Sequence, residues 1–183
     1  WLWSPGRAPQ LPTFLARRGM TGAVISAVDV VRGLGKLTGL EIVHVPGATG
    51  YFDTNYVGKG QYALDALTRH NFVWVHVESP DEAGHLGSIE EKIRAIENFD
   101  KKVVGTLLAG LEGKEEFRLL CVPDHKTPIA KRGHTVGPVP YLLYDSRKPL
   151  RTSALYPYDE RAVMEAKSIF DEGYRLIEHL FKG

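Results

Sequence analysis

Apolar and polar positions repeat with two different periods along the chain, and the changes between them predict alternating strands and helices. Short apolar runs predict strands at 22–28, 40–45, 71–77, 117–122 and 139–144, and helical spacing predicts helices at 11–18, 29–37, 56–70, 89–111 and 162–181. The run at 71–77 is almost continuously apolar, which is typical of a strand buried on both faces. This alternation predicts an α/β fold class with a mainly parallel sheet flanked by helices.

Polar signals indicate where two of these helices begin. Thr13 stands at the start of the first helical segment and is a candidate N-cap. Ser88 and Glu91 have the spacing of a capping box, directly ahead of the long apolar repeat that begins at Ile89. The intervening stretch 46–55, PGATGYFDTN, consists of turn residues and predicts a loop.

Length and composition limit the classes of function. The 183 residues are 43% hydrophobic and 25% charged with a net charge of +1, so nothing favours a nucleic-acid or anionic membrane partner. No apolar run reaches the roughly 20 residues that a membrane-spanning helix needs. The single cysteine, Cys121, excludes an intrachain disulfide framework and indicates a reducing compartment. We therefore expect a cytoplasmic protein.

Three short polar motifs follow predicted strands or lie in adjoining loops. They contribute Asp81 and His85 in SPDEAGH, Asp124 and His125 in PDH, and His134 in GHT. Ligand sites of α/β folds gather beyond the carboxyl ends of the strands. Imidazole together with carboxylate suits Zn²⁺ or Mn²⁺, and two such ions about 4 Å apart can clamp a phosphoryl group. The three motifs in this order therefore favour a metal site.

Each motif alone also has an ordinary structural interpretation. Asp81 is compatible with a turn cap, and the Asp124–His125 pair with a side chain that satisfies a loop backbone. His134 is compatible with a plain surface residue. Two further histidines in predicted strands, His44 and His76, are interpreted as satisfied core or half-buried groups.

Taken together, the motifs resemble the metal-site signature of the alkaline phosphatase superfamily, and most of all the archaeal-type, cofactor-independent phosphoglycerate mutases. The flanking segments GRAPQLPTF, GAVISAVD, GATGYFDTN and DEGYRLI support this resemblance. It implies an alkaline phosphatase-like fold that is incomplete at its N-terminal side. Residues 1–10 would be a linker that returns from a missing inserted domain, and 11–183 the C-terminal part of the metal-binding domain.

The resemblance also implies the ligands of two divalent ions, Mn, Zn or Mg. Asp81, His85 and His134 would hold one ion, while Asp124 and His125 would supply half of the second site. The family completes that site with an aspartate from an early strand and a serine or threonine nucleophile from an early helix. Neither has a counterpart in this sequence.

The implied activity is interconversion of 3-phosphoglycerate and 2-phosphoglycerate through a phosphoenzyme, without a requirement for 2,3-bisphosphoglycerate. Because the nucleophile is absent, we expect residues 1–183 to be inactive alone. Arg7, Lys59 and Lys126 are candidate substrate contacts, since cationic side chains suit phosphate and carboxylate. Each is also compatible with an exposed, solvated position.

Two other functions stay open. One is a different phosphomutase or a phosphatase of the same superfamily. The other is a non-catalytic module in which the metal only stabilises the fold. A missing early strand would leave a sheet edge that invites pairing with another chain. We therefore expect self-association, or tight binding to the missing segment and inserted domain.

Overall fold

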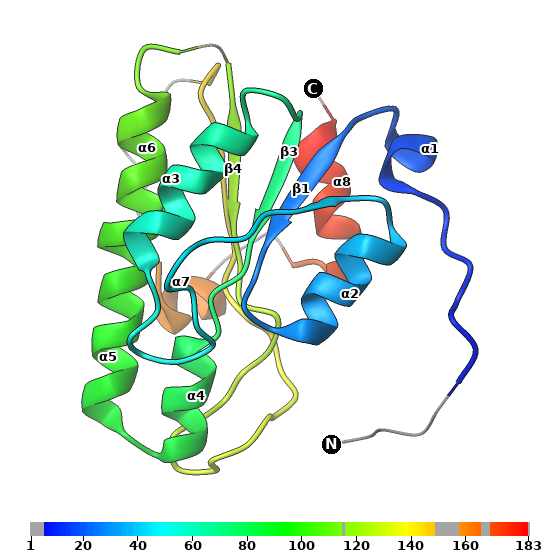
Figure 1. Ribbon diagram of the computed structural model, residues 1–183. Coiled ribbons are helices and arrows are strands. Elements are labelled where there is room, and N and C mark those ends of the chain that lie inside the picture. The colour runs from blue at the N-terminus through cyan, green and yellow to red at the C-terminus, as the bar shows by residue number, and fades with distance from the viewer. Residues whose placement is uncertain (1–5, 115, 149–157, 166–168, 183) are drawn as a thin grey trace.

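The computed structural model describes residues 6–114, 116–148, 158–165 and 169–182 (Figure 1). Residues 1–5 of the predicted linker, 1–10, therefore lie outside the described residues. The elements in chain order are α1 (Phe14–Arg18), β1 (Gly22–Ile25), α2 (Asp29–Leu37), β2 (Glu41–Ile42), α3 (Tyr56–Ala66), β3 (Phe72–Val75), α4 (Ser79–Leu86), α5 (Ile89–Asn98), the π-helical segment η1 (Phe99–Val104), α6 (Gly105–Leu111), β4 (Arg118–Cys121), β5 (Leu142–Asp145), α7 (Glu160–Glu165), the 3-10 turn η3 (Gly173–Arg175) and α8 (Leu176–Phe181).

The first three strands form the predicted parallel sheet, in the order β2-β1-β3. Ala23 of β1 pairs with Glu41 on one side and Val73 on the other. The central strand β1 is fully buried, with Ala23 and Val24 both at 0% exposure. β4 and β5 form a separate antiparallel pair, so within the described residues no strand joins β3 to β4.

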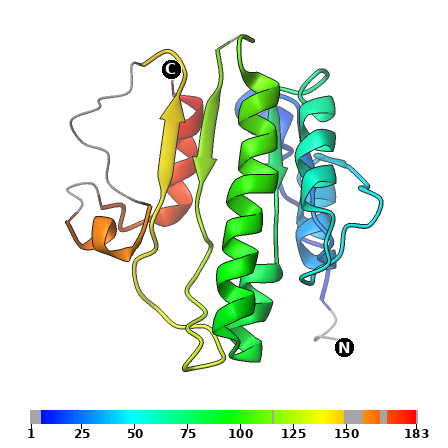
Figure 2. The same ribbon diagram turned by 90° about the vertical axis from the view of Figure 1, so that its left-hand side faces the viewer.

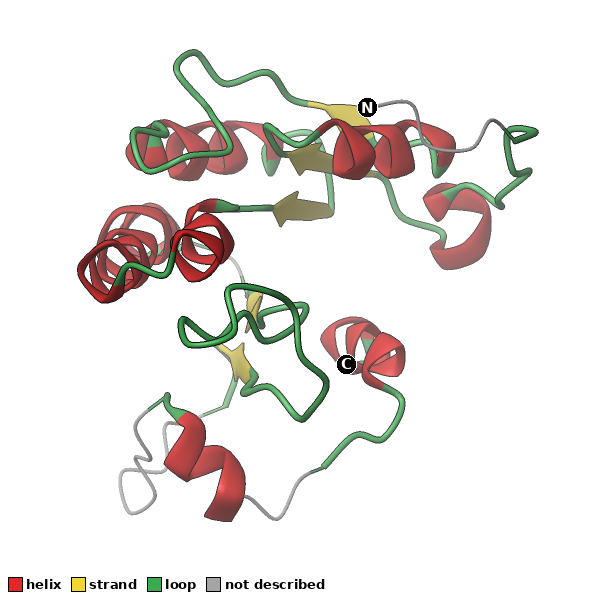
Figure 3. Ribbon diagram, turned by 90° about the horizontal axis from the view of Figure 1, so that it is seen from below, coloured by secondary structure: helices red, strands yellow, loops and turns green. Residues whose placement is uncertain are grey.

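Helices cover both faces of the strands (Figure 3). Ala23 and Ile25 point to the face covered by α3 and the long helix, where they pack with Tyr56 and Val103. Val24 points to the other face, towards α2 and α1, and packs with Val31. This period-2 alternation is what a strand buried on both faces produces.

The long helix over 89–111 is confirmed as one continuous helical rod made of α5, η1 and α6 (Figure 2). The predicted cap is present, because Ser88 Oγ accepts a hydrogen bond from the Glu91 amide at 3.2 Å. Thr13 likewise caps α1 by accepting from the Ala16 amide at 3.1 Å. Within the described residues, no helix has the length and apolar character needed to span a bilayer.

The prediction of one helix over 162–181 is wrong in the described part. After α7, the chain is not helical from 169 to 172, and helical structure resumes only at η3 and α8. Phe170 packs against Tyr141 and His179 at ring-centroid distances of 5.3 and 4.8 Å, and this packing favours a turn over a continuous helix. The strand predicted at 139–144 is also shifted to β5, because prolines at 138 and 140 cannot donate ladder hydrogen bonds.

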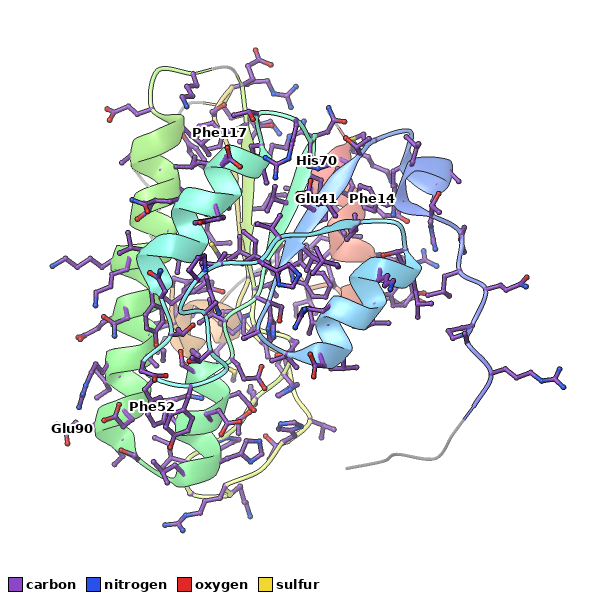
Figure 4. All side chains as sticks on the ribbon, viewed as in Figure 1. Phe14, Glu41, Phe52, His70, Glu90 and Phe117 are labelled. Carbon is purple, nitrogen blue, oxygen red and sulfur yellow. The ribbon has the colours of Figure 1, made fainter. Side chains whose placement is uncertain are left out.

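A cluster of charged and polar side chains, Glu41, Arg69 and His70, lies at the end of the sheet opposite α4. Figure 4 shows Glu41 and His70 together near Phe14. Glu41 accepts from Arg69 at 2.8 Å and contacts His70 at 2.5 Å. Hydrogen bonds from Arg69 and then His70 lower the pKa of Glu41 to about 2. This end is therefore held by ion pairs, while the three polar motifs lie at the other end.

Candidate metal centre

The SPDEAGH motif lies on a helix, α4, where the sequence indicated a loop. Pro80 occupies the first turn, which suits its fixed φ, and Gly87 ends the helix in the left-handed region at φ 78°. Residues four apart share one face of a helix. Asp81 and His85 therefore lie side by side, with Asp81 Oδ2 3.2 Å from His85 Nε2.

Buried contacts fix the position of α4. Ser79 is 0% exposed, and its hydroxyl is 2.6 Å from the hydroxyl of Tyr56 at the start of α3. Lys92 of α5 donates to the carbonyl of Pro80 at 2.6 Å. A Cβ added to Gly84 would lie 2.4 Å from the carbonyl oxygen of Thr127, so only glycine allows so close an approach.

The other two motifs are tied to each other by a short antiparallel bridge. Lys126 and Thr135 pair, and the Thr135 amide donates to the Lys126 carbonyl at 3.0 Å. The bridge places His125 beside His134, with ring centroids 3.8 Å apart. The PDH and GHT loops thus form one surface opposite α4.

The predicted metal residues converge across this surface. His134 Nε2 is 3.3 Å from Asp81 Oδ1 and 3.0 Å from His85 Nε2. Asp81, His125 and His134 each offer a ligand atom within 4.8 Å of the others. Asp124 is at the rim, where its carboxylate is 3.4 Å from His125 Nε2 and its side chain is largely exposed. All five side chains thus occupy one end of the sheet.

Two supporting contacts could not be read from the sequence. Thr127, 6% exposed, donates a short hydrogen bond to Asp81 Oδ1. His85 Nδ1 lies 3.2 Å from the carbonyl oxygen of Arg132, which favours a proton on Nδ1. That tautomer leaves Nε2 free as a metal ligand, the usual arrangement for a ligating histidine.

Lys59 is buried at 1% exposure, so the alternative of a solvated helix residue is wrong. Its ammonium donates to the carbonyl of His76 at 3.1 Å, just past the carboxyl end of β3. Burial lowers its pKa to about 8, and the charge of Glu78 acts in the opposite direction. Lys59 therefore contributes a buried positive charge near Glu78, just past the carboxyl end of β3.

Two more groups at this end are shifted by burial. His76 bridges Ser26 Oγ at 3.1 Å and Glu78 at 3.3 Å, as expected of a satisfied, half-buried histidine. The same prediction for His44 is wrong, because β2 ends at Ile42 and His44 is exposed. Burial and then the charge of Lys59 lower the pKa of His76. Burial, followed by the charge of Asp81 and other nearby carboxylates, raises the pKa of Glu78. Glu78 gave no signal in the sequence, because it belongs to no motif.

The other two candidate substrate contacts, Lys126 and Arg7, have different environments. Lys126 is half-buried in the bridge beside the histidines, and its ammonium lies 3.4 Å from the position that a Cβ on Gly137 would take. Arg7 is exposed and makes no hydrogen bond or ion pair with any described residue. Its segment runs outside the body of the molecule beyond α1 and α2 (Figure 1).

The donor chemistry of this cluster fits a divalent transition ion. Imidazole nitrogens and carboxylate oxygens that converge from three segments are the ligands of Zn²⁺ and Mn²⁺ sites. Two imidazole nitrogens that approach within 3.0 Å beside a carboxylate are the arrangement that a shared cation stabilises.

Comparisons with known proteins agree with this picture. The family model described as the Metalloenzyme superfamily matches residues 1–168. A probable 2,3-bisphosphoglycerate-independent phosphoglycerate mutase from Geobacter sulfurreducens is 49% identical over 97% of the chain, and one from Methanothermobacter thermautotrophicus is equally similar. The structure of PH0037 protein from Pyrococcus horikoshii matches with a TM-score of 0.80 and 26% identity, over 92% of this chain and 50% of that one.

A cofactor-independent phosphoglycerate mutase from Thermoplasma acidophilum shares the fold, with a TM-score of 0.67 at 22% identity, over 94% of this chain and 39% of that one. The alkaline phosphatase-like α/β fold class is thereby confirmed. The chain spans less than half the length of the curated relatives, 44% in the case of the two phosphoglycerate mutases named above.

Proposed function

Because the chain belongs to the Metalloenzyme superfamily, we propose that it forms the metal-binding part of a 2,3-bisphosphoglycerate-independent phosphoglycerate mutase. The observation that carries this proposal is the convergence of Asp81, His85, His125 and His134 from three remote segments. The named relatives at 49% identity support phosphoglycerate as the substrate.

We assign Asp81, His85 and His134 to one divalent ion, and Asp124 and His125 to a second. Asp81, His125 and His134 each offer a ligand atom within 4.8 Å of the others, so the two assigned sites would be adjacent. When bound, the ions would neutralise charge on the transferring phosphoryl group and activate the attacking oxygen. Thr127 orients Asp81, and the Arg132 carbonyl orients His85.

Lys59 would supply the fixed positive charge that faces the phosphate. With a pKa of about 8, its ammonium is mainly protonated at neutral pH. Its place past β3 is set by the hydrogen bond to the His76 carbonyl, so the charge needs no reorganisation when an anion binds. Lys126, on the bridge beside the histidines, is a second candidate contact. Arg7 would reach substrate only if its segment lies elsewhere in the longer protein.

The reaction implied for the longer protein is transfer of a phosphoryl group from the 3-hydroxyl of glycerate to an enzyme hydroxyl, and from there to the 2-hydroxyl. No residue of this chain is assigned as that nucleophile. The 183-residue chain alone is therefore proposed to bind metal but not to turn over substrate. A cytoplasmic location fits the single, half-buried cysteine.

The test combines metal binding with turnover. We expect the purified chain to bind Mn²⁺ or Zn²⁺ in calorimetry, and Asp81→Asn to remove the tighter site. Asp65→Asn is the matched control, because among the described residues the Asp65 carboxylate pairs only with Arg69, on the surface of α3. In the full-length protein, we expect 2-phosphoglycerate from 3-phosphoglycerate without 2,3-bisphosphoglycerate, and loss of that activity with Asp81→Asn.

Other outcomes would select the alternatives. Release of inorganic phosphate in place of 2-phosphoglycerate would identify a phosphatase of the same superfamily. Metal binding that raises the melting temperature, with no turnover of any phosphate ester by the full-length protein, would identify a structural module. Equal metal affinity in the Asp81 and Asp65 variants would refute the assigned centre.

A further inference from the structure

Three polar side chains form a connected row at the carboxyl ends of β1 and β3, which lie side by side (Figure 1). Ser26 follows β1, and its hydroxyl accepts a hydrogen bond from the Val28 amide at 3.0 Å. His76 follows β3 and places Nδ1 3.1 Å from Ser26 Oγ. Its Nε2 lies 3.3 Å from a carboxylate oxygen of Glu78. The position of Glu78 is therefore tied to two neighbouring strands, although Glu78 belongs to none of the three sequence motifs.

The Glu78 carboxylate lies beside the metal centre without being assigned to it. One of its oxygens is within 4.8 Å of a carboxylate oxygen of Asp81. Glu78 and His76 line the same cavity as Asp81, His125 and His134. Among the described residues, the carboxylate makes one ion pair, with His76, and its side chain is 25% exposed. Since an ionised carboxylate has about four acceptor positions, Glu78 can accept further hydrogen bonds from a ligand.

Two more contacts hold Glu78 in place before any ligand binds. A Cβ added to Gly50 would lie 4.0 Å from Cβ and Cγ of Glu78, so the loop over 46–55 packs against the stem of this side chain. Burial lowers the pKa of Lys59 and the charge of Glu78 acts in the opposite direction, so the buried ammonium lies near the carboxylate. A group that is fixed in this way binds a ligand without the cost of ordering its own side chain.

Phosphoglycerate offers a carboxylate only one group to bind. Its phosphate and carboxylate groups are anionic at neutral pH and accept hydrogen bonds, so Glu78 repels both. The remaining polar group is the free hydroxyl, the one that carries no phosphoryl group. A hydroxyl can donate to a carboxylate, and such a charge-assisted hydrogen bond is about twice as strong as a neutral one.

We propose that Glu78 binds substrate by accepting a hydrogen bond from the free hydroxyl of phosphoglycerate, and that His76 and Ser26 are positioning residues for its carboxylate. This inference rests on the proposed function, which supplies the substrate. Asp81 is not available for the same contact, because it accepts from Thr127 and is assigned to a metal ion. Glu82 is the third carboxylate of this group, but no side chain among the described residues holds its carboxylate as His76 holds that of Glu78.

The binding of two ligands to the full-length protein loaded with Mn²⁺ tests this inference. One ligand is 3-phosphoglycerate, and the other is 3-(phosphonooxy)propanoate, which lacks only the 2-hydroxyl. Calorimetry gives the ratio of the two affinities, in which any general effect of charge cancels because both ligands carry the same anionic groups. An active mutase equilibrates 3-phosphoglycerate with 2-phosphoglycerate, but each isomer keeps one free hydroxyl.

We expect Glu78→Gln to lower this ratio about tenfold or more, because a hydrogen bond to a charged group is weakened for the hydroxyl ligand alone. Mn²⁺ affinity should be unchanged. His76→Phe should also lower the ratio, since it leaves the carboxylate without its partner. Glu90→Gln is the matched control, because Glu90 is 87% exposed on α5, and it should leave the ratio as it is.

Four results would overturn the inference. An unchanged ratio in Glu78→Gln would show that the hydroxyl binds elsewhere, and a ratio that falls in Glu82→Gln instead would assign the contact to Glu82. Loss of Mn²⁺ binding in Glu78→Gln would identify a metal ligand. An unchanged ratio in His76→Phe would refute the positioning role. A full-length protein that gives the expected ratios without interconverting the phosphoglycerates would refute the proposed mutase and support the hydroxyl contact.

Discussion

Substitution of Gly84 by alanine separates a local effect from a tertiary one. In an exposed helix interior, Gly→Ala stabilises by about 1 kcal/mol through helix propensity. At Gly84 the added methyl would lie 2.4 Å from the Thr127 carbonyl oxygen and 2.7 Å from Thr127 Cγ2. Cβ contacts below 3.0 Å are essentially never observed, so α4 and the loop must separate by more than half an ångström.

The expected loss of stability depends on which atom the added methyl group meets. Overpacking costs about 1–3 kcal/mol, and the upper end applies here because a backbone oxygen cannot rotate away. After subtraction of the helix-propensity gain, we expect Gly84→Ala to lower the free energy of unfolding by about 2 kcal/mol. The separation also pulls Asp81 away from Thr127 and from the two histidine loops. Metal affinity should therefore fall together with stability.

The matched control is the same substitution at Gly33 of α2. A Cβ at Gly33 meets no atom within 4 Å, so only helix propensity acts. Gly33→Ala should raise the free energy of unfolding by about 0.5–1 kcal/mol and leave metal binding unchanged. Urea denaturation and calorimetric titration with Mn²⁺ measure both quantities. A Gly84 variant that is as stable as the Gly33 variant and binds metal normally would refute the packing argument.

Three further predictions concern single side chains. Ser88→Ala removes the cap of the long helix and should cost about 1 kcal/mol in urea denaturation. Between pH 8 and 10.5, the stability of the unsubstituted chain should rise relative to that of Lys59→Met, because the folded pKa of about 8 lies below the unfolded value of 10.5 and the unfolded state then binds more protons. The Cys121 thiol, whose pKa burial raises to about 11, should ionise at that pH, as measured by the difference in thiolate absorbance between the chain and its Cys121→Ala variant.

Controls for these predictions come from exposed positions of the same chain. Lys36→Met, on the exposed side of α2, should leave the rise in stability between pH 8 and 10.5 intact. The same rise in a Lys59 variant would show that another group causes it. A Cys121 midpoint near the ordinary value of about 8.5 would contradict the burial of this thiol. An unchanged midpoint of unfolding for Ser88→Ala would mean that the helix start is held by packing alone.

Local sequence determined the elements whose causes lie within a few residues. The long helix begins where Ser88 caps it, and its apolar repeat sets its length to Leu111. The apolar runs of β1 and β3 likewise predict parallel strands, but only β1 is fully buried, and the prediction that β3 is buried on both faces is wrong within the described residues. The motif residues Asp81 and His134 could be singled out because three motifs with histidines and carboxylates occur together in the order of a known metal-site signature.

Tertiary structure decided the features that depend on neighbours far along the chain. Lys59 has the sequence context of an exposed helical lysine, and only its packing beneath the end of β3 makes it buried. The hydrogen bond from Thr127 to Asp81 spans 46 residues, and that between Ser26 and His76 spans 50. The separation of β3 from β4 is likewise a tertiary feature, since no ladder joins these strands among the described residues.

The physical reason is the range over which each interaction acts. Caps, turns and periodic burial are set by groups within about four residues, so they can be read from the chain itself. Burial, pKa shifts and ligand geometry are set by whichever remote groups the fold brings within a few ångströms, as when α4 meets the loop at Thr127. The sequence thus identified the residue types of the metal centre. The packing of α4 against the two loops determined how their side chains converge.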